Sequence, residues 1–229
     1  MTSPATQPLC DPVLVAAGIP HGFGRRGSPA PDSTFFPSQV HGVGVVEILD
    51  ETGPAKIEAD GVVSTTVGRV VGIVTADCVP ILAAARDGGA VAAIHAGWRG
   101  LAAGVIEAGI GALRRNSGGA ELICAVGPGA RGCCYEVDEP VRDALRPRYA
   151  PQLEEVLVPA AAGHYQLDLP LLATRILEQI GLESTRIGIE HRACTICDPG
   201  RFESYRRDGT RAGRLRHFIS KPGTIPRQG

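Results

Sequence analysis

The sequence predicts a mixed α+β (mixed α/β) fold in a single domain over residues 1–229, with mixed β-sheets flanked by helices. Short apolar runs typical of buried strands occur together with isolated amphipathic helices. The chain has 229 residues, of which 44% are hydrophobic and 21% charged, enough for a substantial core. We find no internal repeat, low-complexity tract or linker that would divide it.

The first part of the chain predicts strands and extended segments. Residues 1–37 are rich in Pro, Gly and Ser, and we expect one short strand there, around residues 18–24. Apolar runs predict further strands over residues 40–49, 61–64 and 70–74.

A β-hairpin is predicted next. Its strands are the apolar runs 79–85 and 90–94, and the turn is the Arg-Asp-Gly-Gly segment 86–89. With this turn, His95 lies opposite Pro80, one short step along the strand from Cys78. A thiol and an imidazole at one end of a rigid hairpin can share a metal ion or a proton.

The second half predicts helices separated by strands. We expect helices over residues 101–115, 138–149 and 169–180, and strands over residues 121–126, 187–191 and 215–219. The third helix is the best marked, because Asp168 can cap its N-terminus, Pro170 lies in its first turn and Gly181 follows its last turn.

Composition excludes several classes of partner. The net charge of −1 provides no general field for nucleic acid or an anionic membrane. The N-terminus has no secretory signal pattern, and the most apolar stretch, 70–85, is interrupted by Asp77 and Pro80. We therefore expect a cytoplasmic, monomeric protein that binds neither nucleic acid nor membrane. Seven cysteines, an odd number, indicate thiols, metal ligands or catalysis rather than a disulfide framework.

A candidate metal site combines Cys78 and His95 with His41, at the start of an earlier strand. Three such ligands leave one position open, as in a catalytic zinc site. Copper is the alternative, but the axial methionine of a blue-copper centre is missing, because the only methionine is Met1. The residues alone leave two other interpretations open: Cys78 as a buried thiol with His41 in a turn, or Cys78 as a nucleophile with His95 as its base. Asp77 either orients a histidine or, more simply, forms a turn.

The other cysteines favour no site. Cys194 and Cys197 form a C-x-x-C pair, and Cys133 and Cys134 are adjacent. The adjacent spacing argues against a four-cysteine zinc site. The turn residues that follow Cys197 argue against a thioredoxin-like motif. We expect turn-stabilising or buried thiols.

Six motifs carry a resemblance to a known family: SQVHG, ADGVVS, TADCVPIL, AAIHAGWRGL, GPGARGCCYEV and FESYRRDGTRAGR. In this order the chain resembles the laccase-domain (YfiH-like) family, first described as multicopper polyphenol oxidases and now regarded as purine nucleoside phosphorylases. The resemblance implies a fold similar to that of the cytotoxic necrotising factor cysteine hydrolases. It also implies a zinc site at His41, Cys78 and His95, and phosphorolysis of adenosine, inosine and methylthioadenosine, with adenosine deamination as a side activity.

Phosphorolysis requires a held phosphate, and the planar fork of arginine binds phosphate oxygens in pairs. The catalytic candidates are Cys78, His95 and Arg206. The candidates for binding purine nucleoside and phosphate are Arg25, Arg99, Tyr205, Arg206 and Arg214. Arg207 is the least favoured arginine, and Tyr135 and Glu136 either face the pocket or serve packing.

Two features of the sequence argue against assigning the family's activity to this chain without alternatives. Only residues 26–38 lie between its Gly22-Phe23-Gly24-Arg25 motif and its Gln39-Val40-His41-Gly42 motif, where the family usually carries a longer segment. The H-x-E and P-C-x-x-C signature of the zinc base deaminases is absent. A copper-dependent polyphenol oxidase, a metal-free Cys–His hydrolase or deamidase, and a non-catalytic partner of cell-wall or division machinery therefore remain as alternatives.

Overall fold

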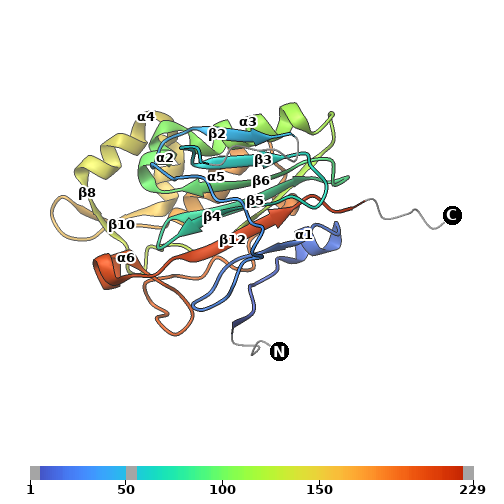
Figure 1. Ribbon diagram of the computed structural model, residues 1–229. Helices are drawn as coiled ribbons and strands as arrows, with labels where there is room; N and C mark the ends of the chain where they lie inside the picture. Colours follow the sequence, from blue (N-terminus) through green and yellow to red (C-terminus); the bar gives the residue numbers. More distant parts are fainter. Residues whose placement is uncertain (1–5, 50–55, 224–229) are drawn as a thin grey trace.

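A six-stranded mixed sheet forms the centre of the fold (Figure 1). The computed structural model describes residues 6–49 and 56–223. From one edge to the other, the strands are β11 (Ile187–Gly188), β7 (Leu122–Val126), β5 (Val79–Ala85), β6 (Val91–Ala96), β3 (Gly61–Ser64) and β2 (Val45–Ile48). The β2–β3 and β7–β11 pairs are parallel and the other pairs antiparallel, which confirms the expected mixed α+β architecture.

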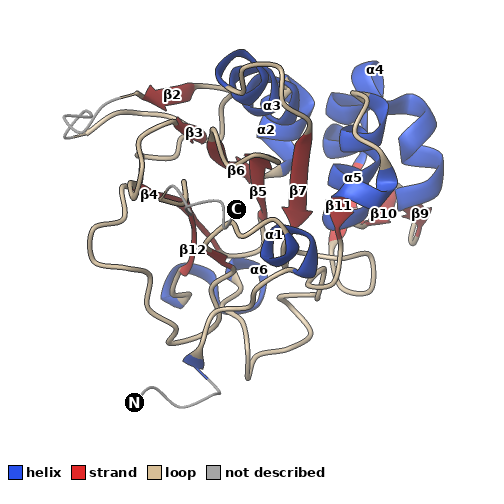
Figure 2. Cartoon of the chain, turned by 90° about the vertical axis from the view of Figure 1, so that its right-hand side faces the viewer, coloured by secondary structure: helices blue, strands red, loops and turns tan. Residues whose placement is uncertain are grey.

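Both faces of this sheet are covered. On one face lie α2 (Trp98–Ala103), α3 (Val105–Asn116), α4 (Glu139–Val156) and α5 (Leu169–Gln179). On the other lie α1 (Pro12–Ala16) and a three-stranded antiparallel sheet of β1 (His21–Gly22), β12 (Leu215–Ser220) and β4 (Val70–Thr75). Figure 2 shows this layering, with β4 and β12 on the side of the central sheet opposite α2 and α3.

The layering explains why the central strands read as continuous apolar runs. In β5, Ile81 packs into the core under the helices, while the adjacent Leu82 packs into the core under the small sheet. Every residue of β5 and β6 is buried. A strand buried on both faces shows no alternation of polar and apolar residues.

The predicted hairpin is confirmed, including its register. Strand β5 pairs with β6 antiparallel, and His95 is the partner of Pro80. Gly88 in the turn has φ +76°, a conformation that glycine adopts without a steric penalty. The hairpin therefore brings Cys78 and His95 to the same end of the sheet.

The helices differ from the predictions in three places. The single helix expected over residues 101–115 is two helices, α2 and α3, because the chain bends at Gly104, which has φ +95°. Helix α4 extends to Val156 rather than ending at Tyr149, and it kinks at Tyr149, which has φ −130° between Pro147 and Pro151. Helix α1 was not predicted, although Asp11 caps it by accepting a hydrogen bond from Val13 N at 3.0 Å and a proline opens it. One and a half turns are too short for a recognisable apolar period. Helix α5 agrees with its prediction, since Asp168 accepts from Leu171 N at 3.0 Å.

Two predicted strands are shorter in the structure, and one sheet was not predicted. The run 40–49 forms a strand only over β2, because Asp60 holds residues 40–42 in a loop, and the run 187–191 forms one only over β11. A third sheet was not predicted: β8 (Glu136–Asp138), β10 (His164–Leu167) and β9 (Leu157–Pro159). Its strands are short and partly exposed, so they carry little apolar signal. The expected extended segment 1–37 includes residues 1–5, which lie outside the described residues.

The remaining short elements are α6 (Tyr205–Asp208) and two 3-10 turns at Ser184–Arg186 and Gly209–Arg211. Within residues 6–49 and 56–223, no helix is long and apolar enough to span a bilayer.

Candidate metal centre

Three residues from three places in the fold converge at one end of the hairpin. His95 lies near the end of β6, Cys78 immediately precedes β5, and His41 stands in the loop before β2. Their ligand atoms lie within 4.8 Å of one another. The two imidazole rings meet edge to face, with centroids 4.9 Å apart. The structure thus brings together the three residues that the sequence suggested as ligands.

Asp60 orients His95. His95 is 3% exposed, and its Nδ1 lies 2.8 Å from Asp60 Oδ1. A carboxylate accepts, so Nδ1 carries a proton and Nε2 is the ring nitrogen that faces Cys78 and His41. The backbone adds a second connection, since His95 N donates to Asp60 O at 2.7 Å.

The same carboxylate holds the loop of His41. Asp60 accepts hydrogen bonds from Val40 N at 3.2 Å, His41 N at 2.9 Å and Gly42 N at 2.7 Å. This cradle fixes His41 at φ +59°, a conformation unusual for a residue with a side chain. Burial raises the pKa of Asp60, but hydrogen bonds from His95 and the loop amides outweigh it, and the net pKa is lowered. One ionised carboxylate therefore positions two of the three ligands.

Cys78 and His95 favour opposite charges when no metal is present. Burial raises the pKa of the Cys78 thiol, but hydrogen bonds with His41 and His95 bring it down to about 7. Burial lowers the pKa of His95, but hydrogen bonds with Asp60 and Cys78 raise it to about 9. The pair therefore favours a thiolate beside an imidazolium, which is the charge distribution of a reactive cysteine.

Asp77 does not orient a histidine, and its role is larger than that of a simple turn residue. Its buried carboxylate accepts from Thr195 Oγ1 at 2.6 Å, Ser204 Oγ at 3.0 Å and Arg206 N at 2.7 Å. Asp77 itself has φ +84°. It thus fastens the 195–206 segment to the residue next to Cys78, a contact between positions more than a hundred residues apart.

A cavity of about 720 Å³ opens onto this centre. Four of the predicted binding residues line it: Arg99 on α2, Tyr205 and Arg206 on α6, and Arg214 before β12. The other residues that line it are Gln39, His41, Val74, Thr75, Ala76, Asp77, Cys78, His95, Gly97, Trp98, Tyr135 and Leu169. The volume is in the range of small-molecule sites.

Aromatic rings accompany the arginines in this cavity. The guanidinium carbon of Arg99 lies 4.4 Å from the Trp98 ring centroid, and that of Arg206 lies 5.0 Å from the Tyr135 ring centroid. Such contacts hold a guanidinium over a ring face. Tyr135, for which packing was the alternative, is buried and also lines the cavity.

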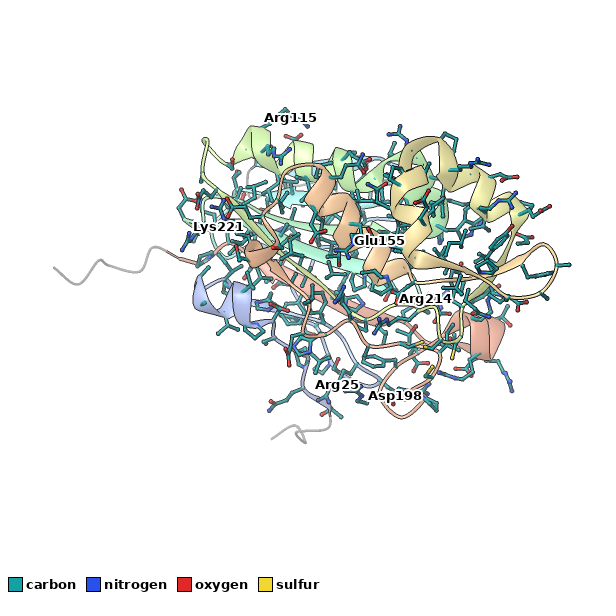
Figure 3. All side chains as sticks on the ribbon, turned by 180° about the vertical axis from the view of Figure 1, so that it is seen from behind. Arg25, Arg115, Glu155, Asp198, Arg214 and Lys221 are labelled. Atoms are coloured by element: carbon teal, nitrogen blue, oxygen red, sulfur yellow. The ribbon has the colours of Figure 1, made fainter. Side chains whose placement is uncertain are left out.

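Three other residues considered from the sequence lie elsewhere. Arg25 does not line the cavity; its Nε donates to Gln7 O at 2.8 Å, and Figure 3 shows it well apart from Arg214. Glu136 is exposed in β8, 3.3 Å from His164 Nδ1. Arg207 donates to the backbone oxygens of Thr195, Ile196 and Phe202, so it braces a loop.

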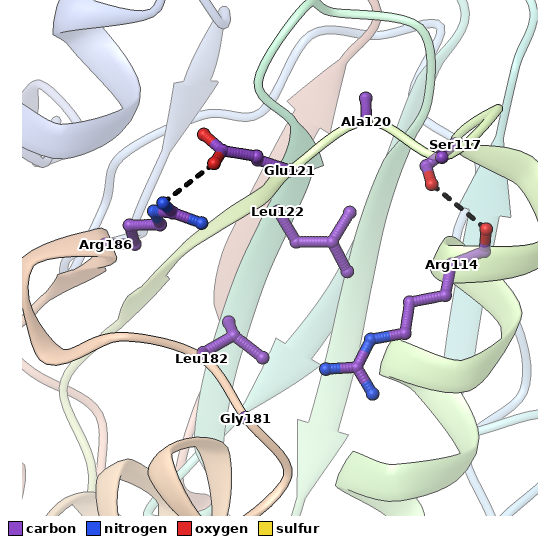
Figure 4. Close-up of a pocket in the computed structure, with 9 residues that line it drawn as sticks. Arg114, Ser117, Ala120, Glu121, Leu122, Gly181, Leu182 and Arg186 are labelled. Carbon is purple, nitrogen blue, oxygen red and sulfur yellow. Dashed lines mark hydrogen bonds and ion pairs between the residues drawn. The ribbon is translucent and has the colours of Figure 1, made fainter.

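A second hollow, of about 390 Å³, lies between the ends of α3 and α5 and the start of β7 (Figure 4). Its arginines already have structural partners. Arg114 donates to Ile180 O at 2.6 Å, and Arg186 pairs with Glu121 at 2.8 Å. No histidine or cysteine is among the residues that line it, so it offers no chemistry comparable to that of the first cavity.

Four other cysteines lie together, although their spacing in the sequence argued against a common site. Cys133, Cys134, Cys194 and Cys197 place their sulfur atoms within 4.8 Å of one another. Cys133 and Cys197 are exposed rather than buried. Cys133 and Cys134 can both approach the C-x-x-C pair because the turn that carries them lies beside that segment in the folded chain.

The chain that carries this centre is similar to known proteins. The family described as "Multi-copper polyphenol oxidoreductase laccase" matches residues 24–221, which include all three candidate ligands. The chain belongs to this family. Among solved structures, the chain is similar to YlmD from Geobacillus stearothermophilus, with a TM-score of 0.76 and 30% identity over 84% of this chain and 74% of that one.

Two curated relatives of this laccase-type family carry functional names. A protein of Xylella fastidiosa named purine nucleoside phosphorylase is 40% identical over 182 residues, which are 77% of this chain and 68% of the relative. A protein from an unknown prokaryotic organism, named adenosine deaminase RL5, is 31% identical over 192 residues, covering 80% and 73%.

Sequence reasoning missed Asp60 as the organiser of this centre. The residue was visible within the ADGVVS motif, but the orienting role was considered only for Asp77. One signal was available. Asp60 immediately precedes β3, and β3 pairs with β6 so that Gly61 lies opposite Ile94, the neighbour of His95. This pairing places the Asp60 carboxylate close to His95.

Gly97 provides a test of how tightly the centre is packed. A Cβ at this position would lie 2.8 Å from Cys78 Sγ and 3.2 Å from His41 Cδ2. Gly97→Ala is therefore expected to push these two ligands apart and lower metal affinity at least tenfold, a cost of about 1.4 kcal/mol, while leaving the fold intact. Metal affinity is measured by competition with a chelating dye.

The matched control is Gly111→Ala in α3, where a Cβ would meet only Arg115 Nη1 at 3.9 Å. This change should leave metal affinity unaltered and stabilise the helix by roughly 1 kcal/mol. Equal metal affinity in the Gly97 and Gly111 variants would show that the centre has room to spare.

Proposed function

We propose that the protein is a zinc-dependent enzyme that cleaves the N-glycosidic bond of purine nucleosides with phosphate, acting on adenosine, inosine and methylthioadenosine. The observation that carries the proposal is one cavity in which a thiol and two imidazoles face three arginines and several aromatic rings. The name of the Xylella fastidiosa relative supports the same reaction class.

The arginines supply the means to hold phosphate. Arg99, Arg206 and Arg214 line the cavity of a chain whose net charge is only −1, so the positive charge here is local. Guanidinium groups bind phosphate oxygens in pairs and keep their charge at any physiological pH. Arg206 is the best fixed of the three, because its backbone is held by Asp77 and its guanidinium lies over Tyr135.

The aromatic residues suit a purine base. Trp98, Tyr135 and Tyr205 offer ring faces for stacking within the cavity. Burial raises the pKa of Tyr135, the nearby Cys78 raises it further, and Arg206 opposes them without reversing the shift. The phenol therefore keeps its proton at neutral pH and can donate a hydrogen bond to the departing base.

The donor set fits zinc. One thiolate and two imidazole nitrogens within 4.8 Å are ligands that zinc prefers, and the cavity leaves the fourth direction open to substrate. His41, Cys78 and His95 would hold the ion. When bound, it supplies a Lewis acid that polarises an oxygen of the substrate or phosphate. Metal analysis distinguishes zinc from copper, and copper-dependent oxygen uptake with a phenol would instead support the oxidase alternative.

The reaction is tested by incubating the protein with adenosine or inosine, with and without phosphate, and following free base by chromatography. We expect base release that depends on phosphate. Release of ammonia or inosine from adenosine in the same assay measures deamination, which we propose as a side activity because of the relative named adenosine deaminase. Absence of phosphate-dependent base from any purine nucleoside would refute the proposal.

Arg206→Ala is expected to reduce the phosphate-dependent rate about 100-fold, mainly by raising the KM for phosphate, since one charge-assisted contact to the reacting anion contributes this much. Arg146→Ala serves as the matched control, because Arg146 is exposed on α4 and does not line the cavity. Equal phosphate KM values for the two variants would remove Arg206 from the phosphate site.

A metal-free cysteine hydrolase is the second candidate, favoured by one observation. Asp60, His95 and Cys78 form a line in which a carboxylate orients an imidazole beside a thiol of lowered pKa. Rapid alkylation of Cys78 in the protein as purified, with no stoichiometric metal bound, would favour the hydrolase. Protection of Cys78 that is lost only after a chelator is added would favour the metalloenzyme.

Metal binding should release more protons as the pH falls. The metal requires a Cys78 thiolate and a free lone pair on His95 Nε2. With pKa values of about 7 for Cys78 and about 9 for His95, the pair has one proton to lose between pH 7 and 9 and two below pH 7. The apparent affinity then falls about tenfold per pH unit below pH 9 and more steeply below pH 7. Calorimetry in buffers of different ionisation enthalpy measures the protons released, and a count independent of pH would contradict this assignment.

A further inference from the structure

Four cysteines outside the cavity converge from two distant segments of the chain. Cys134 Sγ lies 2.6 Å and Cys133 Sγ 3.3 Å from Cys197 Sγ, and Cys194 completes a group within 4.8 Å. All four are at least partly exposed. In Figure 3, yellow sulfur atoms gather between the labels of Arg214 and Asp198.

Backbone hydrogen bonds bring the two segments together. Gly129 N donates to Ala193 O and Thr195 N donates to Gly129 O, both at 3.1 Å, so Cys194 is bridged to Gly129. On the first segment, a tight turn aims both cysteines outward, since Cys134 N and Tyr135 N both donate to Arg131 O. The convergence is therefore a property of the backbone and not of mobile side chains alone.

Two arginines hold the C-x-x-C turn and the residues before it. Arg207 Nη1 donates to Thr195 O at 3.0 Å and to Ile196 O at 3.2 Å, the two carbonyls between Cys194 and Cys197. Arg131 Nη1 donates to Arg192 O at 3.2 Å.

We propose that Cys133, Cys134, Cys194 and Cys197 form a second metal site, which binds one Zn²⁺ through four thiolates. At a Zn–S distance of about 2.3 Å, a tetrahedral centre separates its sulfurs by roughly 3.8 Å. The sulfurs of Cys134 and Cys133 lie 2.6 Å and 3.3 Å from that of Cys197, and all four sulfurs lie within 4.8 Å of one another, so they are close enough to share one ion. Binding displaces the protons of those thiols that are not already ionised.

A four-cysteine site leaves no open position for substrate, so its role is structural. It would join the turn that carries Tyr135 to the segment that carries Ser204 and Arg206. Both Tyr135 and Arg206 line the cavity. The second ion would therefore support one wall of the first site from outside without taking part in the reaction.

Metal content tests the proposal in protein purified without chelator. We expect two zinc ions per chain in the unchanged protein, one in Cys78→Ala, one in Cys197→Ser and none in the double variant. Cys10→Ser is the control, because Cys10 is exposed and belongs to neither group, and it should retain two ions. Zinc-free Cys78→Ala protein, or iron in place of zinc, would overturn the proposal.

Two measurements on the Cys78→Ala protein keep the test decisive if Cys197→Ser does not fold. Cobalt substitution should give thiolate-to-metal charge-transfer bands typical of a tetrahedral sulfur site. Native thiol titration should show that four cysteines become reactive only when a chelator is added. Two intact disulfides within the cluster, detected by mass before reduction, would refute the metal site.

Discussion

Asp60→Asn is expected to lower the affinity of the centre for zinc by about 10- to 100-fold, although it changes none of the three ligands. An amide has one acceptor oxygen, whereas the Asp60 carboxylate uses both of its oxygens to accept from residues 40–42 and His95. The NH₂ group would face backbone N–H donors or the protonated Nδ1 of His95. Either the His41 loop or the His95 ring must then lose its fixed orientation.

Competition with a chelating dye measures the loss of affinity, and the phosphate-dependent rate measured at saturating zinc should recover in part. Asp87→Asn is the matched control, because Asp87 lies in the exposed hairpin turn, where it accepts from Gly89 N at 2.8 Å. Asparagine can make the same contact there. If both variants bound zinc as tightly as the unchanged protein, Asp60 would be only a structural neighbour of the site.

Asp77→Ala is expected to lower the free energy of unfolding by about 3 kcal/mol or more. Three donors, Thr195 Oγ1, Ser204 Oγ and Arg206 N, lose their acceptor, and each buried donor left unpaired costs about 1–3 kcal/mol. Alanine is also disfavoured at φ +84°. For a chain of this size the midpoint of thermal unfolding should fall by about 6–12 °C.

Asp77→Asn separates the two causes, because asparagine tolerates positive φ and keeps one acceptor oxygen. We expect it to lose about half as much stability as the alanine variant. Phosphate KM should rise in the alanine variant, because the backbone N–H of Arg206 loses its acceptor, and should change less in the asparagine variant, whose remaining oxygen can still accept from Arg206 N. A loss below 1 kcal/mol for Asp77→Ala would mean that the 195–206 segment is held mainly by its other contacts.

Local chemistry in the sequence predicted the hairpin well. Gly88 and its neighbours determined the turn, the turn determined the register, and the register placed His95 opposite Pro80. Apolar runs indicated the buried strands because β5 and β6 are covered on both faces. His41 joined the pair as a third residue of a metal-ligand type at the start of an earlier strand, and the family motifs then implied a substrate class.

Contacts between distant residues were the part that could not be predicted. Asp60 and Asp77 are each an ordinary acidic residue beside a strand, and only the folded chain shows that one serves His95 and the other serves Arg206. The convergence of the four cysteines was missed for the same reason. The spacing typical of zinc sites places two ligands on each of two short turns, and adjacent Cys133 and Cys134 do not have that spacing. The kink at Tyr149 and the short third sheet likewise depend on packing rather than on local pattern.

The three ligands of the centre differ in how firmly the fold holds them. Cys78 and His95 stand on a buried hairpin, whereas His41 is exposed on a loop whose amides are held by one carboxylate. At the proposed metal site, affinity would therefore depend on all three residues, whereas the lifetime of the bound ion would depend on how often the His41 loop opens. A site built in this way would bind a metal tightly at equilibrium and still exchange it quickly, because a local opening suffices and the sheet need not unfold.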